Sequence, residues 1–437
     1  MGAGISGLTA AFRLKLGGQR VAVLEEAPRV GGAIETYSEG AWRFEMGPNT
    51  VLATDESTDG LIRDAGLADE KIVASSSAKR RYLYKGGQLV PLPGGPGGLL
   101  TTPLFSLSAK LRVLREPWIG RPPEGVEESI AQFVRRRLGE AFLDNAVGPF
   151  VSGIYAGDPE RLSARWAMPR IQTLEAEHGS LLRGAIARRK GPAHGRTMIS
   201  FREGLEALPR RLAREIGDVR TGIAAQRIVR AGDGFRVDTS AGPVEAARVV
   251  LAVPADVAAR LLEEVTSGAS RLLAEIPYAA VAVVSLGARR EDVGHPLDGF
   301  GFLAPRKEGM RTLGCLFPSE IFPGRAPEGH VALAAFGGGR TDPAFTELDD
   351  EQIVATVLND LRGPLSLRGE PVFHLVRRWP RAIPQYELGH GRFVERAREI
   401  ERNLPGLRIS GNFLEGISVP DCIRNATALA ALSVAAI

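Results

Sequence analysis

GAGISG, residues 2–7, has the form G-x-G-x-x-G and leads into LTAAFRLKL (8–16), whose apolar spacing is that of a helix. VAVLEE (21–26) follows as a short apolar strand that ends in acid, with Glu25 about 20 residues beyond the glycines. This is the layout of a dinucleotide-binding unit, because the glycines let the backbone approach a pyrophosphate at the helix N-terminus. The acid at the end of the second strand accepts hydrogen bonds from a ribose. The stretch therefore predicts a Rossmann-like nucleotide-binding domain.

The strand that should precede the glycine motif is missing, since only Met1 stands before Gly2. In such domains this strand lies in the middle of a parallel sheet and is buried on both faces. Either the chain lacks residues that its relatives have, or the position of this strand is filled in another way. A domain that truly lacks the strand should be less stable and hold its nucleotide weakly. An inactive, N-terminally truncated product is one interpretation that the sequence leaves open.

Length and composition describe a globular protein of several domains. The 437 residues exceed what one hydrophobic core usually supports, so two or three domains are expected. The net charge of +4 is modest, and the basic residues are not interleaved with aromatic residues, so we expect no nucleic acid partner. Cys315 and Cys422 cannot build a disulfide framework, and the six histidines show no metal-binding spacing. The chain shows no leader and no membrane-spanning stretch, which favours a cytoplasmic location.

Two further segments extend the first motif. RVGG (29–32) follows Glu25 closely, and EMGPNT (45–50) comes next. Taken alone, RVGG is best read as a glycine-rich surface turn. Together with the first motif, the two segments resemble the FAD-dependent oxidases of the amine oxidase and protoporphyrinogen oxidase group, in which they lie along FAD. The resemblance implies FAD rather than NAD as the cofactor.

Four later segments sharpen the resemblance to the protoporphyrinogen oxidase family. They are SGIYAGD (152–158), DGFGFLAP (298–305), IPQYELGH (383–390) and EGISVPDCIRNA (415–426). They come in order and at compatible spacing, so the similarity covers nearly the whole chain. The implied fold class is α/β and α+β, with three domains: a Rossmann-like FAD-binding domain (1–60, 205–255 and 390–437), a mixed-sheet substrate-binding domain (61–93 and 256–389) and a helical membrane-associated domain (94–204).

The residues expected to bind FAD are carried over from the family position by position. They are Gly2, Gly4, Ser6, Gly7, Glu25, Arg29, Gly31, Gly32, Gly47, Pro48, Asn49, Thr50, Ala225, Trp379, Gly411, Asn412, Ile417, Ser418 and Val419. Ala225 stands where the family usually has a valine whose backbone meets the adenine. Asp421 is expected to cap the closing helix, whose N-terminus would stabilise negative charge on the reduced flavin.

The residues expected to bind the substrate are carried over in the same way: Arg81, Gly153, Ile154, Phe300, Leu303, Ala335 and Phe336. Arg81 matches an arginine that pairs with a propionate, and a guanidinium binds a carboxylate through two hydrogen bonds. From the residues alone, Arg81 reads as a solvated hairpin charge beside Lys79 and Arg80. Ala335 stands where relatives often carry methionine, which leaves the shape of the cavity and the preferred porphyrinogen open.

The function that the resemblance implies is the oxidation of protoporphyrinogen IX to protoporphyrin IX, the penultimate step of haem biosynthesis. Oxygen accepts the electrons and becomes hydrogen peroxide, and no side chain is expected to be catalytic because the flavin carries the chemistry. Two alternatives remain open: a coproporphyrinogen III oxidase, which needs more cations around the cavity, and a general flavin amine oxidase. We expect peripheral contact with the inner face of the cell membrane. A homodimer and hand-over of the porphyrin to the next haem-pathway enzyme also remain open.

Overall fold

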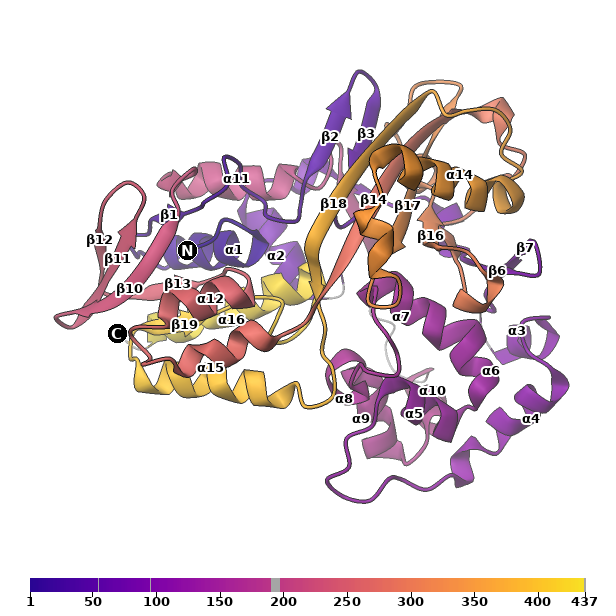
Figure 1. The fold of residues 1–437 in the computed structure, drawn as a ribbon, viewed down its shortest axis with the longest axis horizontal. Coiled ribbons are helices and arrows are strands. Elements are labelled where there is room, and N and C mark those ends of the chain that lie inside the picture. The colour runs from indigo at the N-terminus through magenta and orange to yellow at the C-terminus, as the bar shows by residue number, and fades with distance from the viewer. Residues whose placement is uncertain (54, 95, 190–196, 436–437) are drawn as a thin grey trace.

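The computed structural model describes residues 1–53, 55–94, 96–189 and 197–435. Figure 1 shows one region around both chain ends, a long twisted sheet beside it and a group of helices below the sheet. Each region has its own hydrophobic core. The chain passes between the regions several times, so residues far apart in sequence meet where the regions join.

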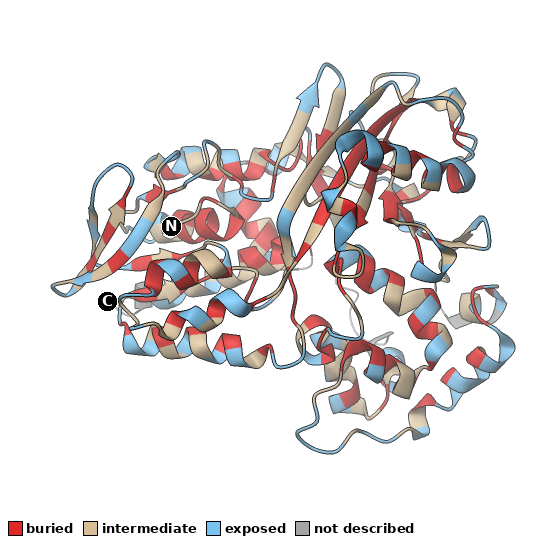
Figure 2. Ribbon diagram, viewed as in Figure 1, coloured by how far each residue is buried: buried red, intermediate tan, exposed pale blue. Residues whose placement is uncertain are grey.

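Short parallel strands and long helices form the region around the chain ends. β1 (Val23–Leu24) pairs with β9 (Val219–Arg220), and β13 (Val249–Leu251) pairs with β19 (Leu407–Ile409), both in parallel. The helices of this region are α1 (Ile5–Leu16), α2 (Glu56–Asp64), α11 (Ala207–Ile216), α12 (Ala255–Leu262), α15 (Gly391–Asn403) and α16 (Val419–Ala435). Helix α1 packs against α11 and α16, and its first eight residues are buried because they are small or apolar (Figure 2).

Met1 and Gly2 lie between the two parallel strand pairs. The Gly2 N–H donates to the Leu24 carbonyl at 2.8 Å, which joins the first residues to β1. On the other side, the Met1 amine donates to the Val250 carbonyl at 2.7 Å, and the Ala252 N–H donates to the Met1 carbonyl at 2.9 Å. Helix α1 is thus the first regular element of the chain, as the sequence predicts, and Met1 and Gly2 join β1 to β13.

Small antiparallel sheets flank this region. They are β2 (Thr36–Glu39) with β3 (Trp42–Glu45), β10 (Ala225–Ala231) with β11 (Gly234–Thr239) and β12 (Val244–Ala246), and β8 (Thr197–Phe201) between β4 (Val51–Ala53) and β5 (Lys71–Val73). The position of β8 corrects the expectation that 94–204 belongs wholly to a helical domain. Ile199 and Phe201 are buried in the same core as Leu8 of α1, so β8 belongs with the chain ends.

A mixed sheet forms the second region. Its order is β18 (Phe373–Pro384), β14 (Tyr278–Arg289), β17 (His330–Gly338), β16 (Thr312–Leu316), β15 (Gly301–Leu303), β6 (Tyr82–Lys85) and β7 (Gln88–Pro91). Only β15 and β6 pair in parallel, so the expected mixed sheet is confirmed. Helix α14 (Asp350–Leu365) packs on one face, where Val284 and Leu286 meet its buried residues. The opposite face carries Val281 and Val283, because side chains alternate along a strand.

Helices make up the third region, whereas the short helix α13 (Pro318–Ile321) packs against β17 of the mixed sheet. The helices of the third region are α3 (Pro96–Thr101), α4 (Leu107–Leu114), α5 (Ile130–Arg137), α6 (Glu140–Phe142), α7 (Gly148–Tyr155), α8 (Ala164–Ala167), α9 (Pro169–His178) and α10 (Leu181–Arg189). Among the described residues, none of the helices has both the length and the apolar character needed to cross a membrane. The membrane association of this region stays a prediction, as do the predicted domain boundaries elsewhere.

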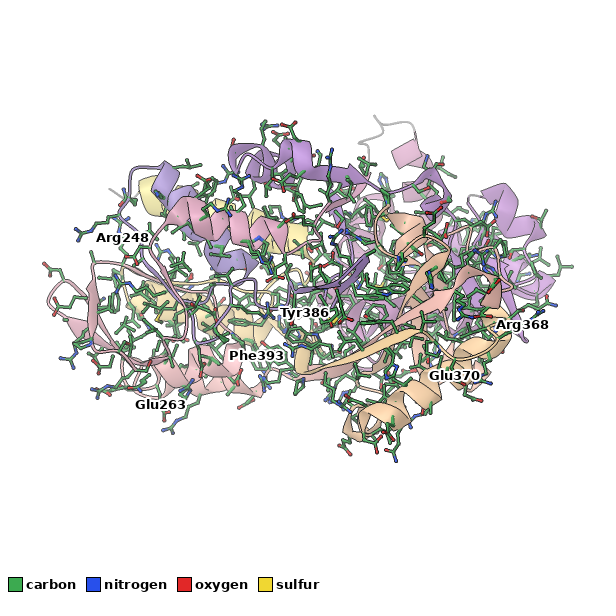
Figure 3. The ribbon with its side chains drawn as sticks, turned by 90° about the horizontal axis from the view of Figure 1, so that it is seen from above. Arg248, Glu263, Arg368, Glu370, Tyr386 and Phe393 are labelled. Carbon is green, nitrogen blue, oxygen red and sulfur yellow. The ribbon has the colours of Figure 1, made fainter. Side chains whose placement is uncertain are left out.

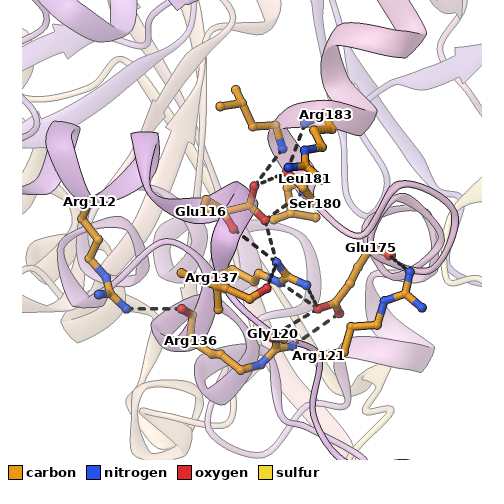
Figure 4. A network of polar contacts seen from close by, with 12 residues as sticks. Arg112, Glu116, Gly120, Arg121, Arg136, Arg137, Glu175, Ser180, Leu181 and Arg183 are labelled. Carbon is orange, nitrogen blue, oxygen red and sulfur yellow. Dashed lines mark hydrogen bonds and ion pairs between the residues drawn. The ribbon is translucent and has the colours of Figure 1, made fainter.

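A buried ion network holds the helices of the third region together (Figure 4). Arg137 at the end of α5 is fully buried and pairs with Glu116 at 3.0 Å and, through Nε, with Glu175 of α9 at 2.7 Å. The Glu116 carboxylate also accepts the N–H groups of Leu181 and Leu182, at 2.9 and 3.1 Å. One carboxylate therefore caps α10 and compensates the buried arginine at the same time.

Candidate functional site

A cavity of about 3100 Å³ runs through the place where the three regions meet. Its wall includes both glycine loops, the free face of the mixed sheet, helices α7 to α9 and the turn before α16. All residues expected to bind FAD line it except Gly7, and all residues expected to bind the substrate line it except Ala335. The fold therefore brings the two predicted sets together from segments that are far apart in the chain.

Gly4 and Gly7 of the first glycine loop have different surroundings. A Cβ on Gly4 would meet nothing within 4 Å, so the backbone there is open to the cavity. A Cβ on Gly7 would lie 1.9 Å from the Gly2 carbonyl oxygen. Gly7 therefore does not line the cavity, contrary to the expected cofactor contact. It lets the first turn of α1 lie against the loop, and the open loop edge suits a pyrophosphate.

Glu25 holds the end of β1 against the glycine loop. One carboxylate oxygen accepts the Ala3 N–H at 2.6 Å, and the other accepts the Ala27 N–H at 2.9 Å. An ionised carboxylate has about four acceptor positions, so two remain for ribose hydroxyls on the cavity side. The geometry fits the ribose-binding role that the sequence predicts.

The second glycine pair packs directly on the first. The Gly31 N–H donates to the Ala3 carbonyl at 2.8 Å, and Gly32 has a positive φ of +59°. The Arg29 guanidinium donates to the Gly32 carbonyl at 2.7 Å and the Ile34 carbonyl at 3.1 Å. Arg29 therefore fixes the shape of this loop through backbone carbonyls, and its guanidinium also pairs with the Glu35 carboxylate at 3.0 Å.

The expected flavin side is built around close backbone packing. A Cβ on Gly47 would lie 2.0 Å from the Ala33 carbonyl oxygen, so only glycine fits. The Trp379 indole N–H donates to the Met46 carbonyl at 2.6 Å, which ties β18 to the loop after β3. The Arg377 guanidinium lies 4.6 Å from the Trp379 ring centroid and pairs with Glu35 at 2.9 Å. Arg377 is absent from the predicted set, although its two-residue spacing from Trp379 places both side chains on one face of β18.

Two buried rings, those of Tyr386 and His390, contact backbone carbonyls of the turn before α16. The Tyr386 hydroxyl donates to the Asn412 carbonyl, and His390 Nε2 lies 3.1 Å from the Leu414 carbonyl oxygen. Burial raises the pKa of Tyr386 and lowers the pKa of His390, so both rings are neutral at pH 7. Tyr386 lies near the middle of the molecule (Figure 3), and neither ring was found from the sequence.

Ser418, rather than Asp421, caps helix α16. The Ser418 hydroxyl oxygen accepts the Asp421 N–H at 3.2 Å, while its O–H donates to the Asp421 carboxylate at 2.5 Å. The expectation that Asp421 caps this helix is thus wrong by three positions, since Ser418 directly precedes Val419, the first helical residue.

The substrate side of the cavity combines apolar walls with an arginine. The exposed Arg81 guanidinium lies 5.3 Å from the Phe300 ring centroid and 3.9 Å from Met198 Sδ. Ile154 is 43% exposed toward this space, and a Cβ on Gly153 would lie 2.4 Å from a methyl group of Leu303. Gly153 therefore lets α7 approach β15. Met198 also lines the cavity but lies outside the predicted set.

Ala335 does not face the substrate side, in contrast to the prediction. It is fully buried and packs in the core between the sheet and α14. The next residue, Phe336, lines the cavity, because neighbouring side chains on β17 point to opposite faces. Ala335 is therefore not part of the cavity wall.

Comparison with known proteins places the chain in a family. Residues 5–432 match the flavin containing amine oxidoreductases, and the chain belongs to this family. It is 34% identical to the chloroplastic protoporphyrinogen oxidase of Oryza sativa, over 98% of this chain and 86% of that one. It is 28% identical to the coproporphyrinogen III oxidase of Bacillus subtilis, over 97% and 94% of the two chains.

Solved structures show the same fold. A crystal structure from Exiguobacterium sp. 255-15 aligns with a TM-score of 0.84 at 24% sequence identity, over 100% of this chain and 98% of that one. The family match, rather than this likeness of fold, makes the protein a flavin-dependent oxidoreductase with FAD as its cofactor. The glycine loops, Glu25 and the open edge at Gly4 fit this cofactor. Among the described residues, no group of three or more His, Cys, Asp or Glu side chains is placed to hold a metal ion.

Proposed function

We propose that this protein oxidises protoporphyrinogen IX to protoporphyrin IX in haem biosynthesis, with oxygen as the final electron acceptor. The observation that carries this proposal is the cavity itself. It joins the FAD-binding loops to an apolar space that holds the Arg81 guanidinium, which has no carboxylate partner among the described residues. A porphyrinogen is apolar except for its carboxylates, so it matches this wall. The named activities of the rice and Bacillus relatives support the same substrate class.

The side chains of the cavity would bind and orient the substrate. Arg81 would bind one carboxylate through two hydrogen bonds, with its planar group held over Phe300. Leu303, Phe336 and Ile154 would cover the macrocycle and exclude water. Bound FAD supplies the two-electron oxidation, and three rounds, each reducing one O₂ to hydrogen peroxide, complete the conjugated ring. The protein would not need a catalytic acid or base.

The test is to follow the visible spectrum of the purified protein and then porphyrin fluorescence after adding protoporphyrinogen IX in air. We expect flavin bands and growing fluorescence. Arg81→Gln should raise KM by about tenfold, the effect of one lost charge-assisted hydrogen bond, with kcat less affected. Lys79→Gln is the matched control, because Lys79 is exposed and lies outside the cavity wall. Flavin bands without porphyrin formation would contradict the proposal, and absence of flavin would favour the inactive product.

The other candidates receive unequal support. The segment 415–422 contains no aromatic residue, so it cannot supply the aromatic cage expected of a general amine oxidase. A coproporphyrinogen III oxidase is favoured by further arginines in the cavity wall, Arg165 and Arg170.

We also propose that the protein lies peripherally on a membrane surface, with α4 in contact with lipid. Leu107, Leu111 and Leu114 form one face of this helix and are 72%, 52% and 54% exposed, and Trp118 just beyond is 78% exposed. Such a face suits the interface between lipid headgroups and acyl chains. Flotation with anionic vesicles should fall when Leu111 and Trp118 are changed to Ser, and not for the control Leu16→Ser on α1. Equal flotation of all three proteins would contradict this role.

A homodimer and hand-over to the next haem-pathway enzyme stay predictions.

A further inference from the structure

We propose that Tyr386 and His390 are positioning residues that turn backbone N–H groups toward the flavin of bound FAD and thereby raise its reduction potential. The N–H groups belong to the turn before α16, residues 411–418, which follows β19. The proposal rests on FAD as the cofactor and does not depend on which substrate the enzyme oxidises. It gives the two buried rings a role in tuning the cofactor.

The turn before α16 separates the cavity from the core of the chain-end region. Most of its residues line the cavity wall: Gly411, Asn412, Glu415, Gly416, Ile417 and Ser418. The side chains of Phe413 and Leu414 are buried in the core that includes β13 and β19. The backbone of this turn is therefore part of the surface that a cofactor in the cavity meets.

Side chains on the protein side hold the carbonyls of this turn. Three carbonyls accept such a hydrogen bond: Asn412 from the Tyr386 hydroxyl, Leu414 from His390 Nε2 at 3.1 Å, and Glu415 from Asn425 Nδ2 at 2.8 Å. Tyr386, His390 and Asn425 all lie outside the cavity wall. The three carbonyls are therefore directed away from the cavity.

The N–H groups that follow these carbonyls must point the opposite way. In a trans peptide the carbonyl and the next N–H lie on opposite sides of the chain, and none of the described peptide bonds is cis. The N–H groups concerned are those of Phe413, Glu415 and Gly416. Within the part of the chain that the structure describes, none of the three has a hydrogen-bond acceptor. These donors are thus available to a group in the cavity.

Tyr386 and His390 are themselves fixed in place by other rings. Their own ring centroids lie 4.4 Å apart, and both side chains are buried. Tyr386 packs edge-on against Tyr155 of α7 at 6.2 Å, and His390 packs edge-on against Trp166 of α8 at 5.3 Å. The Tyr386 carbonyl also accepts the Ser163 N–H at 2.8 Å. The two donors therefore cannot follow the turn if it moves, and they hold its carbonyls in one direction.

Directed N–H groups favour the reduced flavin because reduction adds negative charge to its ring. Dipoles that are already oriented stabilise this charge without rearranging when it develops. Two carboxylates, Glu415 and Asp421, also line the cavity and act in the opposite sense, although Asp421 pairs with Arg424 at 2.6 Å. Both carboxylates stay in place when Tyr386 or His390 is changed, so a difference in potential between variants reports the orientation of the turn.

The test is an anaerobic titration of the FAD-loaded protein, in which flavin absorbance is followed against a reference dye of known potential. Tyr386→Phe keeps the ring and removes the hydroxyl. At a given potential the ratio of reduced to oxidised FAD should fall about tenfold, which lowers the midpoint by about 30 mV for a two-electron couple. Tyr155→Phe is the matched control, because its buried hydroxyl donates to the Ala167 carbonyl at 2.8 Å and not to the turn. Its ratio should change by less than about twofold.

His390 offers a second pair of variants, which decides the question if Tyr386→Phe does not retain FAD. His390→Gln places an amide N–H near the position of Nε2 and should keep the wild-type potential. His390→Asn has a shorter side chain that does not reach the Leu414 carbonyl, so it should lower the ratio of reduced to oxidised FAD as Tyr386→Phe does.

A purely structural role of the two rings predicts a different result. If they only stabilised the fold, oxidised and reduced FAD would lose affinity equally, and the potential would not change. Wild-type potentials in both Tyr386→Phe and His390→Asn would overturn the proposal, as would equal shifts in Tyr386→Phe and Tyr155→Phe. The titration contains no porphyrinogen. Failure to oxidise porphyrinogens would therefore contradict the proposed function and leave this result unaffected.

Discussion

At the scale of single residues, Gly4 and Gly7 separate cofactor binding from folding. Gly4→Ala adds a methyl group to open space at the cavity edge, so the fold should tolerate it while the FAD Kd rises about tenfold or more. Gly7→Ala places a methyl group against the Gly2 carbonyl and should cost about 1–3 kcal/mol of stability. Thermal unfolding of the apoproteins and FAD titration check both. The same loss of stability in both variants would contradict this division of roles.

Glu45 should make stability depend on pH. Burial raises the pKa of its carboxyl from 4.5 to about 7, against hydrogen bonds from Thr36 and Leu205 and the positive charge of Arg325. Between these values the folded state binds more protons than the unfolded state, so this group's stabilisation is full below pH 4.5 and lost as pH rises to 7. Glu45→Gln should remove a pH-dependent difference on the order of 3 kcal/mol. Parallel pH profiles of wild type and variant in urea unfolding would refute this.

At the scale of elements, the helical region depends on the buried charge of Arg137. Arg137→Met leaves the Glu116 and Glu175 carboxylates without their buried partner, which should cost about 3–5 kcal/mol. Because Glu116 also caps α10, hydrogen exchange should increase there and in α5 before it increases in the mixed sheet. Arg135→Met, which breaks exposed pairs with Glu140 and Glu160, is the control and should cost less than about 1 kcal/mol. Similar losses in both variants would contradict the role of burial.

The elements also differ in how well their sequence predicts their place in the fold. The glycine motif and Glu25 could be located because their role depends on neighbours within one βα unit. Strand β8 could not, because it is held by β4 and β5 and by the core around α1, far away in sequence. The error at Ala335 is one of strand register, since a shift of one residue moves a side chain to the other face of β17. Arg165 and Arg170 were missed because only the fold shows which arginines line the cavity.

At the scale of the whole molecule, FAD should stabilise all three regions together. The cavity wall is shared among the chain-end region, the mixed sheet and the helices, while Trp379 gives one direct hydrogen bond between the first two. A ligand that binds only the folded state adds about 2.7 kcal/mol at a hundred times its Kd, so removing FAD should lower Tm by several degrees.

ADP provides the control for this effect, because it can occupy the glycine loops and Glu25 but cannot reach Trp379 and the turn before α16. The measurement is differential scanning calorimetry. At the same multiple of its own Kd, each ligand should raise Tm by the same amount, unless FAD also changes the cooperativity of unfolding. At equal total concentration, the larger contact surface of FAD should give the larger rise in Tm. A single, sharper transition with FAD than with ADP would show that the cofactor couples the regions. An equal rise with both ligands at equal total concentration would mean that the adenosine end carries all the binding energy, and that the flavin side of the cavity contributes nothing to holding the fold together.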